Sequence, residues 1–352
     1  MEKIIQTAIV GFGLSGRVFH APFLHMHTGF NLKKVVERHS DHSREIYPYV
    51  EVVRNHLDLL KDKELDLVVI ATPNIYHFDL AREFLEAGKH VVVEKPFTTT
   101  SDEADELIHI AERAKRKIFV YQNRRWDGDF KTVEQVVYHG YLGELLSYEA
   151  HFDRFAPFAR RSAWRDQPLP GGGVLYDLGS HLIDQALVLF GMPRAVFADI
   201  RKQRAEGGVD DCFDVRLYYD RLTVTLKASV FVKEPGPRYI LHGTKGSFIK
   251  YGIDPQEEML KMGEMPGEEE WGKEDQGNWG LLHAEMNGLQ YHGNIETEPG
   301  NYMDFYNNVR DVLLHSAEMA VHPGEARNVI RIIELAFESQ KEERKMQIKN
   351  MD

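Results

Sequence analysis

Short apolar runs alternate with segments of helical spacing over the first third of the chain. The apolar runs are residues 4–10, 32–36, 65–71, 90–93 and 118–121. Apolar side chains recur at helical spacing over 78–85 and 102–115, which lie between the later runs. Strands that alternate with helices in this way predict a parallel, doubly wound sheet. We therefore predict a first α/β domain over residues 1–123.

The pattern changes after residue 123, where apolar and polar residues alternate with a period of two. The strand-like segments are 147–153, 213–219, 222–230, 239–242 and 247–251. A period of two is typical of a half-buried antiparallel sheet. A tight turn at Asp220-Arg221 predicts a hairpin between the second and third segments. We predict an α+β domain over 124–352, with a large open, mostly antiparallel sheet and a helix at 174–190 on one face.

The rest of the second part contains one segment without clear periodicity and two predicted helices. Residues 254–300 are rich in Glu, Gly, Met and Asn, and we expect an excursion over the surface. Helices are predicted near 301–318 and 325–341, the second from apolar residues at helical spacing. The helix at 325–341 is expected to pack back on the first domain.

A glycine-rich stretch follows the first apolar run and precedes a predicted helix. It reads Gly11-Phe12-Gly13-Leu14-Ser15-Gly16. In a dinucleotide-binding fold the first glycine permits the tight turn, the second lets the backbone approach the pyrophosphate, and the third lets helix and strand pack closely. The helix N-terminus then faces the phosphates. This context predicts that residues 1–123 form a nucleotide-binding Rossmann domain.

Two adjacent residues bear on which dinucleotide binds. Glu37 ends the second apolar run and follows Gly16 by 21 positions, close to the spacing of about 20 expected for an acid that binds the ribose. A carboxylate there accepts hydrogen bonds from the ribose hydroxyls and repels a 2′-phosphate, which favours NAD. Arg38 comes next and could pair with that phosphate, which favours NADP. Both stay open, and the predicted cofactor is NAD(P).

Ligands bind at the carboxyl ends of the strands in doubly wound sheets, and two such ends carry polar residues. One is Thr72-Pro73-Asn74 and the other is Glu94-Lys95-Pro96-Phe97. We predict a cis peptide at Pro96, which would aim Lys95 into the crevice. The alternative is that Lys95 is a surface partner of Glu94. The residues predicted to bind the cofactor are Gly11, Phe12, Gly13, Leu14, Ser15, Gly16, Glu37, Arg38, Thr72, Pro73, Asn74, His77, Glu94 and Lys95.

The helix predicted at 174–190 follows three glycines and carries two acids and an imidazole. Asp177, His181 and Asp184 are spaced i, i+4 and i+7, so a regular helix places them on one face. A carboxylate beside an imidazole fixes its tautomer and raises its basicity, which suits proton transfer. Two alternatives stay open, a polar face toward solvent and a metal site with these three ligands. No second His or Cys cluster supports the metal site, and no metal is predicted.

Composition and charge exclude several classes of function. The 352 residues carry 43 basic and 55 acidic side chains, a formal net charge of −12, which is unlike a protein that binds nucleic acid through its overall field. Cys212 is the only cysteine, so neither an internal disulfide nor a thiolate metal cluster is expected. No apolar run approaches the roughly 20 residues that span a bilayer. We expect a cytoplasmic protein with no nucleic-acid or membrane partner.

Three motifs together resemble the glucose–fructose oxidoreductase and inositol dehydrogenase family (Gfo/Idh/MocA) over essentially the whole chain. They are Gly11–Gly16, Glu94–Phe97 and Gly172–Asp184. The segments Gln122–Asp127 and His242–Asp254 resemble a narrower branch that includes NADP-dependent scyllo-inositol dehydrogenases. The resemblance implies a Rossmann domain followed by a domain with an open sheet, a sugar or polyol substrate bound between them, and a homodimer or homotetramer. NADP-using relatives carry small polar residues and an arginine where this chain has Glu37-Arg38-His39, so the resemblance does not choose the nucleotide.

The resemblance also implies catalytic positions for Lys95, Asp177 and His181. We predict that His181 removes the hydroxyl proton, Asp177 orients His181, and Lys95 stabilises charge on the substrate oxygen. The residues predicted to contact the substrate are Lys95, Asn123, Arg154, Trp164, Arg165, Asp177 and His181. The predicted activity is NAD(P)-dependent oxidation of a secondary alcohol of a sugar or cyclitol, or reduction of the ketone. The alternatives are a cofactor-binding regulator of a sugar pathway without turnover, and an NAD-dependent glycosidase.

Overall fold

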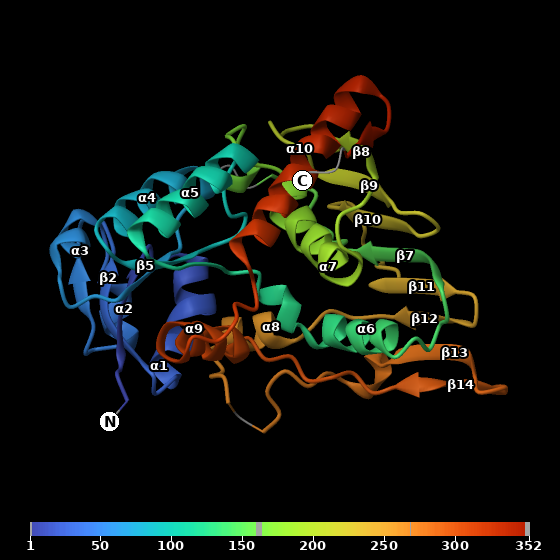
Figure 1. Ribbon diagram of the computed structural model, residues 1–352, viewed down its shortest axis with the longest axis horizontal. Helices are drawn as coiled ribbons and strands as arrows, with labels where there is room; N and C mark the ends of the chain where they lie inside the picture. The colour runs from blue at the N-terminus through green and yellow to red at the C-terminus, as the bar shows by residue number, and fades with distance from the viewer. Residues whose placement is uncertain (1, 160–163, 268, 349–352) are drawn as a thin grey trace. The chain divides into compact units, whose positions relative to one another are not determined.

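The computed structural model describes residues 2–159, 164–267 and 269–348 (Figure 1). The chain divides into two compact units. Unit 1 consists of Met1–Asn123, Gln256–Trp271 and Asn301–Arg327, and unit 2 consists of Arg124–Pro255, Gly272–Gly300 and Asn328–Asp352. The first division falls at 123/124, where the sequence also divides the chain. Two later segments that the sequence analysis assigned to the second domain cluster with unit 1 instead.

Unit 1 is built on a six-stranded parallel sheet in the order β3-β2-β1-β4-β5-β6. The strands are β1 Ile5–Val10, β2 Phe30–Val36, β3 Glu51–Val53, β4 Leu67–Ile70, β5 His90–Val93 and β6 Ile118–Val120. The helices are α1 Ala21–Met26, α2 His42–Ile46, α3 Leu57–Lys61, α4 His77–Glu86, α5 Ser101–Ala114, α8 Gln256–Met262 and α9 Met303–His315. The predicted doubly wound sheet is confirmed, and its strand order reverses between β1 and β4.

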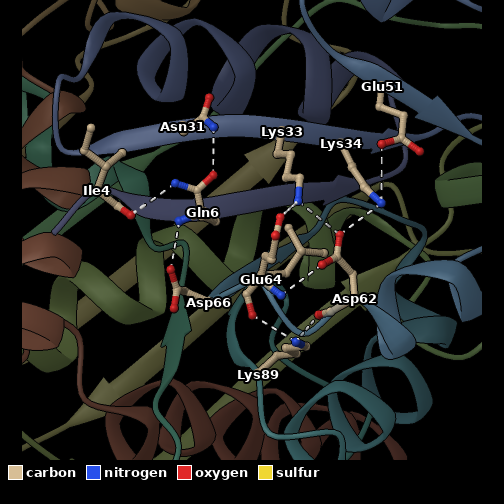
Figure 2. A network of polar contacts seen from close by, with 11 residues as sticks. Ile4, Gln6, Asn31, Lys33, Lys34, Glu51, Asp62, Glu64, Asp66 and Lys89 are labelled. Atoms are coloured by element: carbon tan, nitrogen blue, oxygen red, sulfur yellow. Dashed lines mark hydrogen bonds and ion pairs between the residues drawn. The ribbon is translucent and has the colours of Figure 1, made fainter.

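Charged side chains link the strands of unit 1 near the amino ends of β3, β4 and β5 (Figure 2). The carboxylate of Asp62 lies 2.9 Å from the ammonium of Lys34 and 3.5 Å from that of Lys33. Lys89 donates to the carbonyl oxygens of Asp62 and Leu65. Burial would raise the pKa of Asp62, but the two lysines and a backbone N–H outweigh it and hold the pKa at about 2. These charges satisfy one another, so they stabilise the end of the sheet opposite to the one where ligands bind.

Unit 2 is built on a nine-stranded sheet in the order β14-β13-β12-β11-β7-β10-β9-β8-β15. The strands are β7 Leu145–His151, β8 Ala195–Arg201, β9 Cys212–Tyr218, β10 Thr223–Ser229, β11 Tyr239–Gly243, β12 Gly246–Lys250, β13 Gly280–Met286, β14 Leu289–Ile295 and β15 Met346–Gln347. Neighbouring strands are antiparallel except β10 and β7. The predicted open, mostly antiparallel sheet and the hairpin of β9 and β10 are confirmed.

Three helices lie along one face of this sheet (Figure 1). They are α6 Gly128–Tyr138, α7 Ser180–Phe190 and α10 Pro323–Glu342. Their apolar residues form one core with the inward-facing side chains of the strands, for example Leu182 of α7 and Ile333 of α10 with Leu226 of β10. Burial of alternate strand residues explains the period of two in the sequence.

The structure corrects the interpretation of residues 254–300 as a surface excursion. The segment contains α8, a 3-10 turn at Gln276–Asn278, and the antiparallel strands β13 and β14, which extend the sheet beyond β12. β13 alternates buried Leu282 and Ala284 with exposed residues. β14 is the edge strand and is exposed along most of its length. A strand with one neighbour buries little apolar surface, so the sequence of β14 carries no strong alternation.

Candidate functional site

The glycine-rich loop of unit 1 connects β1 to a π-helical turn, Ser15–His20, that continues into α1. Gly11 has a φ of +96°, and a Cβ there would lie 2.7 Å from the carbonyl oxygen of Ala71, so glycine is required. A Cβ on Gly16 would lie 2.1 Å from the carbonyl oxygen of Gly11. A Cβ on Gly13 would meet no atom within 4 Å. The loop therefore packs closely at Gly11 and Gly16 and is open at Gly13, which fits the approach of a pyrophosphate.

Two buried polar atoms near the carboxyl ends of β4 and β6 have no hydrogen-bond partner among the described residues. They are Oγ1 of Thr72 and Oε1 of Gln122. Buried polar groups are normally paired, so such atoms indicate a place that a ligand completes. Together with the open loop at Gly13, they fit a dinucleotide at the carboxyl end of the sheet, near the switch between β1 and β4.

Glu37 directly follows β2, is 5 % exposed, and is bound by its own loop. Its Oε2 accepts hydrogen bonds from Ser40 Oγ at 2.6 Å and from the backbone N–H of His42 at 3.1 Å. Its Oε1 accepts the N–H of Ser43 at 2.8 Å. Burial would raise the pKa of Glu37, but these hydrogen bonds outweigh it and hold the pKa below its ordinary value. The neighbouring Arg38 is exposed. Of the two residues that favour different nucleotides, one is therefore buried and the other faces solvent.

Glu94 directly follows β5 and is the centre of a buried polar chain. Its Oε1 accepts hydrogen bonds from Ser15 Oγ and from His20 Nε2, the latter at 3.0 Å. Its Oε2 accepts the backbone N–H of Lys95 at 3.0 Å, and His20 Nδ1 lies 2.6 Å from the hydroxyl of Tyr306 in α9. Burial would raise the pKa of Glu94, but His20, Ser15 and the charge of Lys95 lower it to about 2. This carboxylate therefore holds the π-helical turn against the loop that carries Lys95.

Sequence analysis missed His20 and Tyr306. His20 lies four positions after Gly16 in a stretch with few polar residues, which is a local signal because a buried imidazole needs partners. Tyr306 is 286 positions from His20, so no local pattern connects the two residues.

His77, predicted to contact the cofactor, is buried at the start of α4 and joins two strand-end loops. Its Nδ1 lies 3.0 Å from the carbonyl oxygen of Pro96, and its Nε2 lies 3.0 Å from that of Thr72. Burial lowers the pKa of His77, although both carbonyls act in the opposite direction. The Lys95–Pro96 peptide bond is cis, which confirms that prediction. Glu94 and His77 thus fix the Lys95 loop.

The remaining residues predicted for unit 1 lie on the same loops. Phe12 and Leu14 flank Gly13, and Leu14 is exposed. Pro73 and Asn74 lead from β4 into a 3-10 turn, Asn74–Tyr76, with Asn74 buried. Asn123 is buried at the start of a second 3-10 turn, Asn123–Trp126, after β6.

In unit 2 the helix predicted at 174–190 begins with a π-helical turn, Leu175–Gly179, and continues as α7. Such turns are rare and occur frequently at functional sites. The predicted helix is confirmed over residues 175–190, but its first turn is π-helical, so the spacing from Asp177 to His181 is not that of a regular α-helix. His181 is buried, and Asp184 binds Arg125 through two hydrogen bonds of 2.8 and 2.7 Å.

Among the residues that the structure describes, two arginines from separate segments contact Asp177. Arg165 Nε lies 3.0 Å from Asp177 Oδ1, and Arg154 Nη2 lies 3.8 Å from Oδ2. The guanidinium of Arg165 lies over the ring of Trp164, 4.7 Å from its centroid. The structure thus brings together four of the residues predicted to contact the substrate, namely Arg154, Trp164, Arg165 and Asp177. Asp177 lies four positions before His181 in the sequence. Lys95 and Asn123 belong to unit 1.

Asp210, which sequence analysis missed, holds the start of this segment. Its backbone carbonyl accepts the N–H of Val174 at 3.0 Å, and its carboxylate accepts the N–H of Leu175 at 2.8 Å. Gly173 has a φ of +94°, and a Cβ there would lie 2.0 Å from Asp210 Oδ1. Burial raises the pKa of Asp210 to about 6, and the nearby Asp211 acts in the same direction.

Two other kinds of site are absent from the described parts of the chain. No group of three or more His, Cys, Asp or Glu side chains there could hold a metal ion. No helix of the described residues is long and apolar enough to cross a membrane. Cys212 is buried in β9, and burial raises the pKa of its thiol.

Relatives cover nearly the whole chain. The chain is 40% identical over 341 residues to the uncharacterized oxidoreductase YdgJ of Escherichia coli K12, with 97% of this chain and 98% of that protein covered. It is 36% identical over 346 residues to scyllo-inositol 2-dehydrogenase (NADP(+)) IolW of Bacillus subtilis 168, with 98% and 96% covered. The structure of an oxidoreductase from Bacillus cereus matches with a TM-score of 0.91 at 35% identity, and 99% of each chain is covered.

Two family models divide the chain as the fold does at residue 123. Residues 5–122 match the NAD-binding Rossmann fold of an oxidoreductase family, and residues 134–348 match the C-terminal alpha/beta domain of the same family. These matches agree with the motifs that the sequence analysis used. The chain therefore belongs to the Gfo/Idh/MocA family of oxidoreductases.

Proposed function

We propose that this oxidoreductase transfers a hydride between a nicotinamide dinucleotide and a secondary alcohol or ketone of a sugar or cyclitol. The observation that carries the proposal is the π-helical turn of unit 2, which places Asp177 one turn before the buried His181 in a chain that also has an open phosphate-binding loop. The relative named as a scyllo-inositol dehydrogenase supports a polyol as the substrate class.

Side chains of the two units have complementary roles in the proposed reaction. His181 takes the hydroxyl proton of the substrate as general base, and Asp177 favours the protonated form of His181. Lys95 donates a hydrogen bond to the substrate oxygen and stabilises its negative charge. The nicotinamide supplies the hydride chemistry when the dinucleotide is bound. Glu94 and His77 position the loop that carries Lys95.

The test of this proposal is turnover against a panel of cyclitols, aldoses and sugar acids with NAD and NADP, followed at the reduced-nicotinamide absorbance band. Nucleotide binding is measured separately by protein fluorescence. We expect turnover of at least one panel member. Tight nucleotide binding without turnover of any member would contradict the proposal and favour a regulator. Release of a glycoside's leaving group without net reduction of the nucleotide would favour a glycosidase.

We further propose that the preferred nucleotide is NADP. Glu37 is 5% exposed and accepts hydrogen bonds from Ser40 Oγ and from the N–H groups of His42 and Ser43, which leaves little of its acceptor capacity for a ribose. Arg38 is exposed at the same strand end and supplies a guanidinium for a 2′-phosphate. The name of IolW, which specifies NADP(+), supports this choice.

The nucleotide proposal is tested with Arg38→Gln and a matched control, Arg44→Gln, which removes another exposed arginine of the same region. We expect wild type to bind NADPH more tightly than NADH. Arg38→Gln should weaken NADPH binding by about 10-fold or more, as expected for the loss of a charged hydrogen bond, and leave NADH binding unchanged. Equal losses in Arg38→Gln and Arg44→Gln, or a wild-type preference for NADH, would contradict the proposal.

The assembly of the chain stays a prediction. We expect a homodimer or homotetramer, and light scattering after size-exclusion chromatography measures it directly. A monomer at micromolar concentration would contradict this expectation.

A further inference from the structure

Among the described residues, the one negative charge of Asp177 faces the two positive charges of Arg154 and Arg165. Two guanidinium groups, of Arg154 and Arg165, contact the single carboxylate. Each guanidinium has five N–H donors, and Arg154 Nε is buried without a hydrogen-bond partner among the described residues. About a third of each arginine side chain is exposed, 35% for Arg154 and 36% for Arg165. Donors and charge are therefore left for a group that arrives from solvent.

Hydrogen bonds fix the backbone at both arginines independently of Asp177. The N–H of Arg154 donates to the carbonyl of Ser229 at 3.0 Å, and the N–H of Val232 donates to the carbonyl of Arg154 at 3.2 Å. The carbonyl of Arg165 accepts the N–H of Gly173 at 2.9 Å. Arg165 is thus connected to the glycine loop that precedes the π-helical turn.

A buried arginine connects the two segments. Arg204, whose side chain is 6% exposed, donates from Nε and Nη2 to the carbonyl of Ala156 at 3.0 and 2.6 Å, and its Nη1 lies 3.3 Å from Asp166 Oδ1. Ala156 lies two residues after Arg154, and Asp166 directly follows Arg165. The ring of Trp164 supports the guanidinium of Arg165 from one side. The pair is therefore held in place before any ligand binds.

We propose that the substrate is an anionic sugar or cyclitol, whose carboxylate or phosphate binds Arg154 and Arg165. A planar guanidinium pairs with either anion through two parallel hydrogen bonds, which a hydroxyl cannot match. A neutral polyol would leave the excess positive charge uncompensated when it displaces water. The inference rests on the proposed function, because it assigns the substrate class of the same site. Trp164 acts as a positioning residue for Arg165 in this account.

The test compares matched neutral and anionic probes: D-glucose with D-glucuronate and D-glucose 6-phosphate, and myo-inositol with a myo-inositol monophosphate. Turnover with NADP and calorimetric binding in the presence of NADP are measured for each probe. We expect an anionic member to have the highest kcat/KM or the tightest binding. The carboxylate and phosphate arms show which anion is preferred.

Substitutions connect that preference to the arginines. Arg165→Gln should lower kcat/KM or binding of the preferred anion by about 10- to 100-fold and that of the matched neutral probe by a clearly smaller factor, because only the anion loses a charged partner. Arg165→Lys keeps the positive charge but loses the two parallel hydrogen bonds of the guanidinium, so its anion preference should lie between those of wild type and Arg165→Gln. This variant also tests the inference if Arg165→Gln fails to fold. The matched control is Arg201→Gln, because Arg201 Nε lies 3.1 Å from Asp199 on β8, a similar ion pair away from this site. The control should behave as wild type.

The outcomes separate this inference from the proposed function. The inference would be overturned by a preference for a neutral probe, or by an anion preference that Arg165→Gln does not reduce. Turnover in either case would still support the proposed dehydrogenase activity. Anion binding that depends on Arg165 without turnover of any probe would uphold the inference and count against the proposed reaction. Absence of any anion preference in both binding and turnover would overturn the inference.

Discussion

Each unit has a π-helical turn next to a buried carboxylate, Glu94 beside Ser15–His20 in unit 1 and Asp210 beside Leu175–Gly179 in unit 2. Glu94 accepts hydrogen bonds from two side chains and one backbone N–H, and its pKa is lowered to about 2. Asp210 accepts the N–H of Leu175, and burial raises its pKa to about 6.

The pKa values of Glu94 and Asp210 differ because their hydrogen-bond donors offset the cost of burying the charge to different extents. For Glu94 the donors outweigh the loss of hydration, so the carboxylate stays charged near neutral pH. For Asp210 burial outweighs them, so its charge changes close to neutral pH. We infer that Glu94 in unit 1 keeps its charge near neutral pH, whereas Asp210, which supports the turn that carries Asp177, changes charge near pH 6.

The largest expected effect on stability comes from Glu94→Gln, which removes the charge that Ser15, His20 and the N–H of Lys95 share. The free energy of unfolding at pH 7 should fall by about 3 kcal/mol, because a buried network loses its acceptor. The folded pKa of Glu94 is depressed, so its contribution is full above the ordinary value of 4.5 and disappears as pH falls toward 2. Denaturant unfolding at pH 7 and pH 3 measures both effects.

The matched control for that variant is Glu64→Gln, which removes an exposed carboxylate paired with Lys33. A surface change of this kind should alter the free energy of unfolding by less than about 0.5 kcal/mol. Equal losses in the free energy of unfolding for Glu94→Gln and Glu64→Gln would contradict the stabilising role of the buried network around Glu94.

Asp210→Asn tests the buried carboxylate of unit 2. The folded pKa of Asp210 is raised from 3.8 to about 6, so the native state holds more protons in this range and its stability falls as pH rises. The free energy of unfolding of wild type minus that of Asp210→Asn should therefore fall between pH 4 and pH 7, by up to about 3 kcal/mol. Parallel stability curves of the two proteins across this range would contradict the assignment.

The smallest expected effect is that of Glu37→Gln, since the loop hydrogen bonds of Glu37 are local. We expect a loss of about 1 kcal/mol in the free energy of unfolding, because one acceptor oxygen is retained. The ratio of NADPH to NADH affinity should change by less than about threefold. A loss of NADH affinity greater than tenfold with NADPH unaffected would show that Glu37 binds the ribose after all.

Regular patterns in the sequence predict much of this fold. Apolar runs predict the parallel strands, a period of two predicts β9 and β10, and the glycine spacing predicts the close packing at Gly11 and Gly16. These features depend on neighbours within a few residues, or on burial of one face. The cis bond before Pro96 belongs to the same class, because only an X–Pro bond adopts it readily.

The candidate site is less predictable because its contacts join distant segments. Tyr306 reaches His20 across 286 positions, and Arg165 reaches Asp177 from a separate turn. The π-helical turns also escape the sequence analysis, since helical periodicity assumes one residue spacing throughout. Glu37 has the right position for a ribose ligand, and only the hydrogen bonds of its loop reveal its other role.

The most direct test of the account is a single-turnover measurement of hydride transfer in wild type and His181→Ala. Enzyme loaded with NADP is mixed with the best substrate of the panel, and the reduced-nicotinamide absorbance is followed, with NADPH affinity measured for both proteins. We expect a rate about 10²- to 10⁴-fold lower in His181→Ala, the usual contribution of a general base, with unchanged NADPH affinity. Equal rates in the two proteins would contradict the assignment of proton transfer to His181.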